Sequence, residues 1–305
     1  MAISEVVILL VLGLQQSVTI ALAAQGELLS EKSGVMNIGI EGTMLLSAFV
    51  AAYMNWLLRP TFGLSTPYVA LLSGIATGML INFLLAVLST KLYVDQVIAG
   101  IGINVLAGGI TVLALIHIFD VHDQTPPAVT LPYVFTIPGI GSTGQVSLLE
   151  IFAFILPVLT YLLLSRTKFG LRIRAVGENP KAGETAGLNV VRTRILATTL
   201  GGAMLGMSGS YLSIVLNPFF VKSMTHGLGF IALGAVIAGA WSSFLVFGFS
   251  LLFGVTFGVY IEYGGMQGYT YLLAALPYLV TVIAMALTTK RLRPPTALGA
   301  PYKKE

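Results

Sequence analysis

The sequence contains no cysteine, and charged residues make up only 9% of its 305 residues. The absence of cysteine excludes a disulfide framework, thiol chemistry and a thiolate metal site. The low charge excludes an ordinary soluble domain, whose surface needs roughly a quarter to a third charged residues. The three histidines, His117, His122 and His226, match no metal-ligand spacing. No Walker motif occurs, so any ATP hydrolysis linked to this chain must take place in another one.

The sequence as a whole is strongly apolar: 56% of the residues are hydrophobic and the mean hydropathy is +0.91. Runs of about 20 apolar residues recur along the whole length, which predicts an all-α polytopic membrane protein with one transmembrane domain, residues 1–305. The net charge of +4 comes from basic residues that gather in two polar segments. Membrane topology explains that clustering better than nucleic-acid binding does.

The pattern predicts eight or nine spans, with polar segments between them. The runs are Val6–Ala24, Gly34–Leu58, Pro67–Thr90, Val97–Phe119, Leu148–Ser165, Ile195–Leu216, Leu228–Ala240, Phe244–Ile261 and Tyr271–Thr289. Leu228–Ala240 is short for a crossing, so residues 228–262 form either two spans or a re-entrant hairpin. Gln25–Ser33 is interpreted as a polar linker. Gln15 and Gln16, inside the first run, are expected to face protein or a cavity, because unsatisfied amides in hydrocarbon are costly.

The most polar stretch, Arg166–Arg194, carries seven of the sixteen lysines and arginines. It also contains a helix start: Asn179 is a good N-cap, Pro180 suits the first helical position, and Gly187 can end the helix. The sequence therefore predicts a short helix, roughly Pro180–Gly187, beside the membrane. It serves either as a docking element for a partner or as part of a solvated loop that only sets topology.

Charge distribution predicts the orientation. With residues 166–194 and the basic tail, residues 290–305, in the cytoplasm, fourteen of the sixteen basic residues lie inside, and only Arg59 and Lys222 lie outside. The N-terminus is then outside and the C-terminus inside. Residues 1–147 form the first-half spans and an outer loop, 120–146, rich in proline and glycine and therefore not helical. Residues 195–289 form the second-half spans.

Glu41 lies about 10 Å inside the second span, at 1.5 Å per residue, where a carboxylate is expensive. Glycines and Asn37 surround it, as in the broken helices that transporters use to expose polar groups to a cavity. We predict that Asn37, Glu41, Asn82 and Asn104 line the substrate path. Two alternatives stay open: Glu41 reaches the headgroups, and the asparagines link helices to one another.

A weak internal repeat supports a transporter fold. Gly42–Ala52 (GTMLLSAFVAA) and Gly229–Gly239 (GFIALGAVIAG) share a leading glycine and the same rhythm of small and apolar residues. By the span count they start from opposite sides of the membrane, which predicts an inverted-topology repeat.

Five blocks resemble, in order, those of bacterial ABC-importer permeases of the branched-chain amino acid/ribose class: SEKSGVMNIGIEGTMLLSAF, VDQVIAGIGINVLAGGIT, AVGENPKAGETAGLNV, MTHGLGFIALGAVIAGAW and LPYLVTVIAMAL. The likeness is greatest to the nucleoside and simple-sugar branch, in particular to the shorter of its two permease subunits. The sequence departs from many relatives at Ala240, where they carry a basic residue, and at Ser243, where they carry proline.

The resemblance implies a type II ABC-importer-like transmembrane domain in the bacterial cytoplasmic membrane. It implies a second permease subunit, usually in a heterodimer, a cytoplasmic ABC ATPase that holds ATP and Mg²⁺, and an extracytoplasmic substrate-binding protein or lipoprotein. No cofactor is expected on this chain. The ATPase-coupling residues implied are those of the short helix and its approach: Glu178, Asn179, Pro180, Lys181, Ala182, Gly183 and Glu184.

Import of nucleosides is therefore the leading functional hypothesis. The alternatives are a simple-sugar ABC permease of the ribose or galactose type and an ion-coupled secondary transporter that works alone. An intramembrane enzyme is disfavoured, because such an enzyme needs a Ser/His pair, two carboxylates or a metal site in the membrane. Glu41 has no second intramembrane acid nearby in the sequence.

Overall fold

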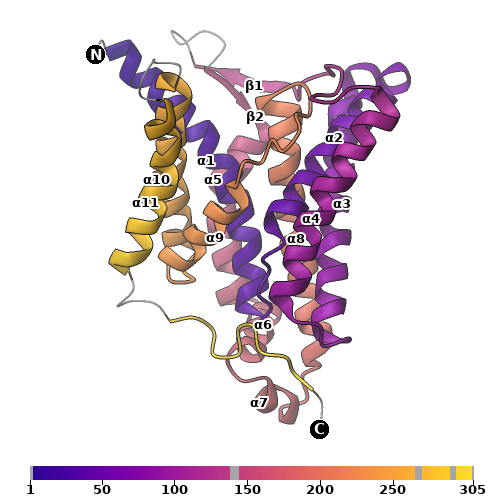
Figure 1. The fold of residues 1–305 in the computed structure, drawn as a ribbon. Helices are drawn as coiled ribbons and strands as arrows, with labels where there is room; N and C mark the ends of the chain where they lie inside the picture. Colours follow the sequence, from indigo (N-terminus) through magenta and orange to yellow (C-terminus); the bar gives the residue numbers. More distant parts are fainter. Residues whose placement is uncertain (1–2, 138–143, 265–269, 289–292, 304–305) are drawn as a thin grey trace.

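The computed structural model describes residues 3–137, 144–264, 270–288 and 293–303, and it shows a bundle of long helices (Figure 1). The long helices are α1 (Ile3–Lys32), α2 (Ile40–Phe62), α3 (Thr66–Thr90), α4 (Gln96–Phe119), α5 (Leu148–Arg166), α8 (Val190–Tyr211), α10 (Ser243–Tyr263) and α11 (Thr270–Thr288). The 120–146 loop residues Pro138, Gly139 and Gly141, and the tail residues Lys290, Arg291 and Lys304, lie outside the described residues.

Seven helical segments among the described residues are long and apolar enough to cross a membrane, and one shorter apolar helix, α9 (Leu228–Ala238), accompanies them. One of the seven, Ile40–Thr90, contains both α2 and α3. These turn at the 3-10 segment η1 (Gly63–Ser65) and run antiparallel, since Thr43 bonds to Asn82 whereas Gly74 lies against Ser47. The sequence prediction of eight or nine spans counted α2, α3 and α9 separately. With 11 residues, α9 is only about 16 Å long.

Helix α8 lies at the centre of the bundle, because its glycines let other backbones approach closely. A Cβ atom at Gly26 of α1 would meet the carbonyl oxygen of Gly201 at 2.5 Å, and one at Gly78 of α3 would meet that of Gly202 at 2.3 Å. A Cβ at Gly209 would meet the carbonyl oxygen of Met44, in α2, at 2.2 Å. Small residues at helix contacts are typical of membrane bundles. Helix α8 ends in a five-residue π-helical segment, η3 (Leu212–Leu216).

The predicted polar linker Gln25–Ser33 is wrong, because α1 continues without a break to Lys32. Its polar residues are buried and bonded within the bundle. Gln25 donates to the Ser243 carbonyl oxygen (2.8 Å) and accepts from the Ser243 hydroxyl (2.9 Å). Glu31 accepts a hydrogen bond from the indole N–H of Trp241. A helix with these distant partners satisfies its side chains inside the protein, so polarity does not end it here.

The two ends of the bundle differ (Figure 1). At one, the hairpin end, β1 (Tyr133–Thr136) pairs antiparallel with β2 (Gln145–Ser147), so the predicted loop contains a small hairpin and the fold is not purely helical. At the other, the α7 end, α6 (Lys168–Glu178) precedes α7 (Pro180–Thr185). The sequence predicted α7 but missed α6, which hides Ile173 and Val176 and exposes its basic residues.

Candidate functional site

The carboxylate of Glu41 lies between the N-termini of two helices. Glu41 is in the first turn of α2, and its two oxygens accept hydrogen bonds from the backbone N–H groups of Gly227 (2.7 Å) and Gly229 (2.8 Å) at the start of α9. Helix N-termini carry partial positive charge and unpaired N–H groups, so both ends favour an anion here. This bridge, the Glu41 clasp, explains how a carboxylate is accommodated inside the bundle.

Two glycines make the Glu41 clasp possible. Gly227 caps α9 with φ of +80°, in the left-handed region that glycine adopts without strain. At Gly229 a Cβ atom would meet the Glu41 backbone nitrogen at 2.7 Å and its carboxylate oxygen at 2.8 Å. From this contact α2 runs toward the hairpin end and α9 toward the α7 end, where Trp241 reaches Glu31. The segments matched as an inverted repeat thus start beside each other and diverge; the repeat itself stays a prediction.

The three predicted asparagines hold the start of α2 in place. Asn104 of α4 accepts from the Gly42 N–H (2.7 Å) and donates to the Ile38 carbonyl oxygen (2.9 Å). Asn37 donates to Asn82 (3.4 Å), which in turn donates to the Thr198 carbonyl oxygen of α8 (3.3 Å). Their amides therefore connect helices, and none of them lines the cavity described next. Their assignment to the substrate path stays a prediction.

A cavity of about 540 Å³ lies next to the Glu41 clasp, between α1, the η3 segment and the ends of α9, α10 and α11. Its polar lining comes from Gln15, Gln16, Asn217 and His226, and three aromatic rings, Phe257, Tyr260 and Tyr278, face it. No Lys, Arg, Asp or Glu is among its described lining residues. Gln15 and Gln16 thus face a cavity, as predicted. The cavity offers amides and aromatic faces to a ligand without net charge.

Tyr278 of α11 connects this helix to the residue before the α9 cap. Its hydroxyl donates to the His226 carbonyl oxygen (2.6 Å). Its ring meets Phe257 edge to face, with the centroids 6.4 Å apart. This contact joins α11 and α10 to the residue just before the α9 cap. Movement of α9 would therefore alter both the clasp and the aromatic wall of the cavity.

Sequence reasoning missed the buried acids of α1. The Glu27 carboxylate accepts from the Asn37 backbone N–H (3.1 Å), and Glu31 accepts from Trp241. Both side chains are almost fully buried, at 0% and 2% exposure. Their spacing of four residues places them on one helix face, a signal that could have shown that the helix continues through them.

At the α7 end, α7 forms a small projection. The Asn179 side chain accepts from the Ala182 N–H (3.0 Å) and Pro180 occupies the first turn, so the helix start is as predicted. Gly187 follows with φ of +83° and turns the chain back toward α8. The exposed residues are Glu178, Asn179, Lys181, Ala182, Thr185 and Ala186, whereas Glu184 is half-buried and Gly183 is buried. Its coupling role stays a prediction.

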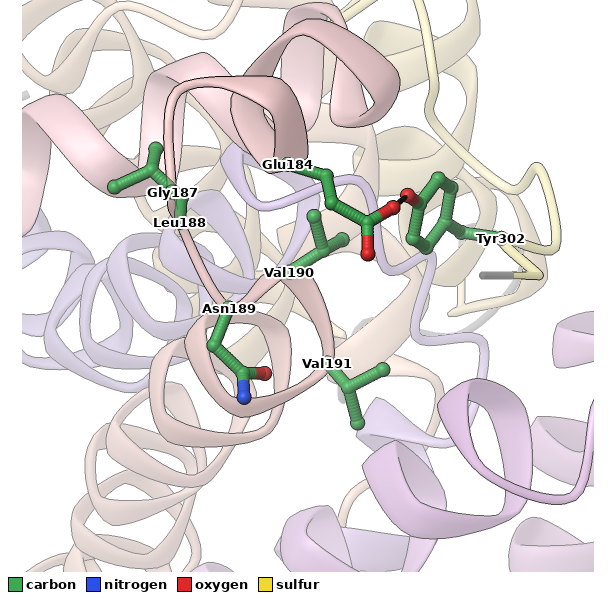
Figure 2. Close-up of a pocket in the computed structure, with 7 residues that line it drawn as sticks. All are labelled: Glu184, Gly187, Leu188, Asn189, Val190, Val191 and Tyr302. Carbon is green, nitrogen blue, oxygen red and sulfur yellow. Dashed lines mark hydrogen bonds between the residues drawn. The ribbon is translucent and has the colours of Figure 1, made fainter. Parts of the chain in front are cut away.

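A second cavity, of about 300 Å³, lies between α7, the start of α8 and the C-terminal tail (Figure 2). Glu184 and Tyr302 face each other across it, joined by a hydrogen bond from the tyrosine hydroxyl. Asn189, which also lines it, caps α8 by accepting from the Arg192 N–H (2.9 Å). The tail thus contacts the projection that the sequence singled out.

Comparison with known proteins finds a matching family and several similar permeases. The family model described as branched-chain amino acid transport system / permease component matches residues 9–286. The guanosine ABC transporter permease protein NupQ of Bacillus subtilis is 33% identical over 296 residues, 93% of this chain and 92% of that protein. The nucleoside ABC transporter permease protein NupC of Lactococcus lactis is 32% identical over 291 residues, covering 92% and 91%.

A relative that matches over a shorter part of the chain carries a different substrate in its name. The putative glucose ABC transporter permease protein TsgC13 of Haloferax volcanii is 32% identical over 235 residues, 74% of this chain and 69% of that protein. No solved structure matches the chain. With a family match over most of its length, the chain belongs to the branched-chain amino acid transport system permease family and is a multi-pass ABC-importer permease, not itself an enzyme.

Proposed function

We propose that the chain is the membrane-spanning permease subunit of an ATP-driven nucleoside importer that works by alternating access. The supporting observation is the 540 Å³ cavity, whose described lining includes amides and aromatic rings and no lysine, arginine, aspartate or glutamate. A nucleoside has a flat base that stacks on aromatic faces and ribose hydroxyls that bond to amides. An amino-acid zwitterion would bring two charges to a cavity whose described lining residues include no Lys, Arg, Asp or Glu to pair with them, at a large desolvation cost.

The assembly that we propose has the α7 end in the cytoplasm and the N-terminus outside. Lys32, Lys91 and the basic residues of α6 lie at the α7 end, while Arg59 and Lys222 lie toward the hairpin end. The ABC ATPase, which holds ATP and Mg²⁺, docks on α7, and the substrate-binding protein docks at the hairpin end. A second permease subunit completes the membrane part as a heterodimer in the bacterial cytoplasmic membrane, and this chain itself holds no cofactor.

Orientation can be tested by labelling, because the chain has no native cysteine. His122→Cys, near the hairpin end, should react with a membrane-impermeant maleimide on intact cells. Thr185→Cys, exposed on α7, should react only after permeabilisation. The two variants control for each other, and the reverse pattern would overturn the proposed topology.

Substrate class can be tested with Tyr260, whose ring lines the cavity. We expect Tyr260→Ala to raise the KM for nucleoside uptake about fivefold or more, because base–aromatic stacking contributes about 1–3 kcal/mol per base. Tyr260→Phe keeps the ring face and should retain most of the affinity. The measurement is uptake of radiolabelled guanosine by proteoliposomes that contain the complete transporter.

A competition panel separates the alternatives. Unlabelled nucleosides should compete with guanosine, whereas ribose, galactose and leucine should not. Competition by the sugars alone, or uptake that persists without ATPase and follows an ion gradient, would instead support the simple-sugar permease or the ion-coupled transporter. The sugar alternative has the support of one relative named for glucose.

A further inference from the structure

The described part of the C-terminal tail contacts the bundle. Residues 293–303 return across the α7 end and finish beside α6 and α7, as the yellow trace below the helices shows (Figure 1). We call residues 293–303 the strap. Within the strap, Pro295, Ala297 and Tyr302 are buried. A basic tail that only set topology would have no reason to bury apolar residues against the bundle.

Hydrogen bonds to the strap backbone fix it to α6, to the α1–α2 connection and to α8. The Ala297 N–H donates to the Gly177 carbonyl oxygen (2.9 Å) near the end of α6, and the Gly299 N–H donates to the Gly34 carbonyl oxygen (3.2 Å) between α1 and α2. Arg194 of α8 donates to the Ala300 carbonyl oxygen and to that of Ser33, each at 3.1 Å. Arg194 is only 1% exposed, so this buried guanidinium links the strap to the bundle from inside the protein.

Side chains of the strap then hold both sides of α7. Thr296 donates its hydroxyl to Glu178 (2.9 Å), immediately before the Asn179 cap. The Tyr302 hydroxyl donates to Glu184 in the last turn of α7 (Figure 2). The Tyr302 ring packs against Val176 and Val190 and is 8% exposed. The strap thus binds two carboxylates, Glu178 just before α7 and Glu184 in its last turn.

Helix α7 needs such support. It has six residues, and an isolated helix of that length is unstable in water. Only Gly183 of α7 is buried, and Gly187, with φ of +83°, follows the helix. Without the strap, a force applied to α7 would turn it about its two ends instead of moving the spans behind it.

We propose that the strap holds α7 in a fixed position relative to the bundle. The Tyr302–Glu184 hydrogen bond is the contact that secures α7 to the strap. A partner that moves α7 then also moves α6, the α1–α2 connection and α8 through Arg194. This inference rests on the proposed docking of an ATPase on α7. It assigns Tyr302, Glu184 and Thr296 a role in coupling rather than in binding the partner.

The test is the number of nucleoside molecules imported per ATP hydrolysed by the complete transporter in proteoliposomes. Tyr302→Phe keeps the buried ring and removes only the hydroxyl donor. We expect it to leave ATPase co-purification and ATP hydrolysis near wild type and to lower import per ATP at least about threefold, because hydrogen bonds to charged groups are among the stronger ones. Glu184→Ala should give the same loss, and the double variant should be no worse than either.

Three further variants sharpen the result. Glu184→Gln keeps an oxygen that accepts from Tyr302 and should restore most of the import per ATP. Tyr68→Phe removes a hydroxyl from an exposed tyrosine of α3, away from the strap, and should behave as wild type. Thr296→Val, at the exposed start of the strap, should show a smaller loss in the same direction.

Each contrary outcome is informative. If no ATPase co-purifies with the wild-type chain, the proposed function fails before the strap is tested. If the wild type couples and Tyr302→Phe and Glu184→Ala keep the wild-type ratio, the strap has no positioning role. If ATPase binding, hydrolysis and import all fall together at a constant ratio, the strap serves assembly only, which also overturns the proposal.

Discussion

Glu41→Ala is expected to lower nucleoside uptake at least about tenfold while the protein still reaches the membrane. The substitution removes both hydrogen bonds to α9, at 2.7 and 2.8 Å, and leaves the N–H groups of Gly227 and Gly229 without that partner. Hydrogen bonds to charged groups contribute about 1.5–3 kcal/mol each, and about 1.4 kcal/mol changes an equilibrium tenfold. In the proposed alternating-access cycle, losing the clasp is therefore expected to shift the balance between conformations far enough to slow transport about tenfold.

Two glycine substitutions serve as a test of the clasp and as its control. Gly229→Ala places a methyl group against Glu41, at 2.7–2.8 Å from its nitrogen and carboxylate, so it should disrupt the clasp without changing its charge. Gly108→Ala, in α4, has no atom of the described residues within 4 Å of the added carbon and should be silent. The measurements are initial uptake rate and membrane abundance. Wild-type uptake by Glu41→Ala and Gly229→Ala would show that the clasp is dispensable for transport.

Local signals explain what could be predicted from the sequence. Asn179, Pro180 and Gly187 act within one helix turn of their own positions, so the start and the end of α7 could be located from residue types alone. The apolar runs likewise identified the long helices, because in a membrane every backbone polar group must be satisfied within the segment.

Long-range partners explain what could not be predicted. Glu41 is satisfied by residues 186 and 188 positions later, and Gln25 by a residue 218 positions later. Nothing in the composition of residues 25–33 shows that Trp241 and Ser243 form hydrogen bonds with them, so the stretch was interpreted as a linker. The aromatic wall of the cavity, Phe257, Tyr260 and Tyr278, looked like ordinary span residues because apolar spans carry many such rings.

The tail shows the same limit. Its basic residues predicted only a cytoplasmic location, whereas the pairing of Thr296 with Glu178 and of Tyr302 with Glu184 spans 118 residues in each case. The small residues at the α7 projection differ in exposure. Ala182 and Ala186 are exposed, whereas Gly183 is buried and a Cβ atom there would lie 3.5 Å from Val176 and 3.7 Å from Leu188.

A large side chain on the exposed face of α7 is therefore expected to separate the permease from its ATPase. Ala182 is exposed, and only its backbone N–H takes part in the N-cap hydrogen bond with Asn179. Ala182→Trp therefore adds an indole to the surface and keeps that hydrogen bond. If α7 inserts into a cleft of the ATPase, that volume blocks close approach. We expect ATPase co-purification and uptake both to fall at least about tenfold, equivalent to about 1.4 kcal/mol of lost docking free energy.

Two controls make this result specific to docking. Gly183→Ala adds a carbon that meets Val176 at 3.5 Å and Leu188 at 3.7 Å, both ordinary contact distances, so it should be tolerated. Leu64→Trp, at an 81% exposed position in η1 at the hairpin end, tests whether any surface tryptophan harms the protein. Ala182→Trp with wild-type co-purification and uptake would mean that α7 only connects α6 to α8. The strap would then hold a structural connector, and the force from ATP hydrolysis would have to enter the bundle elsewhere at the α7 end.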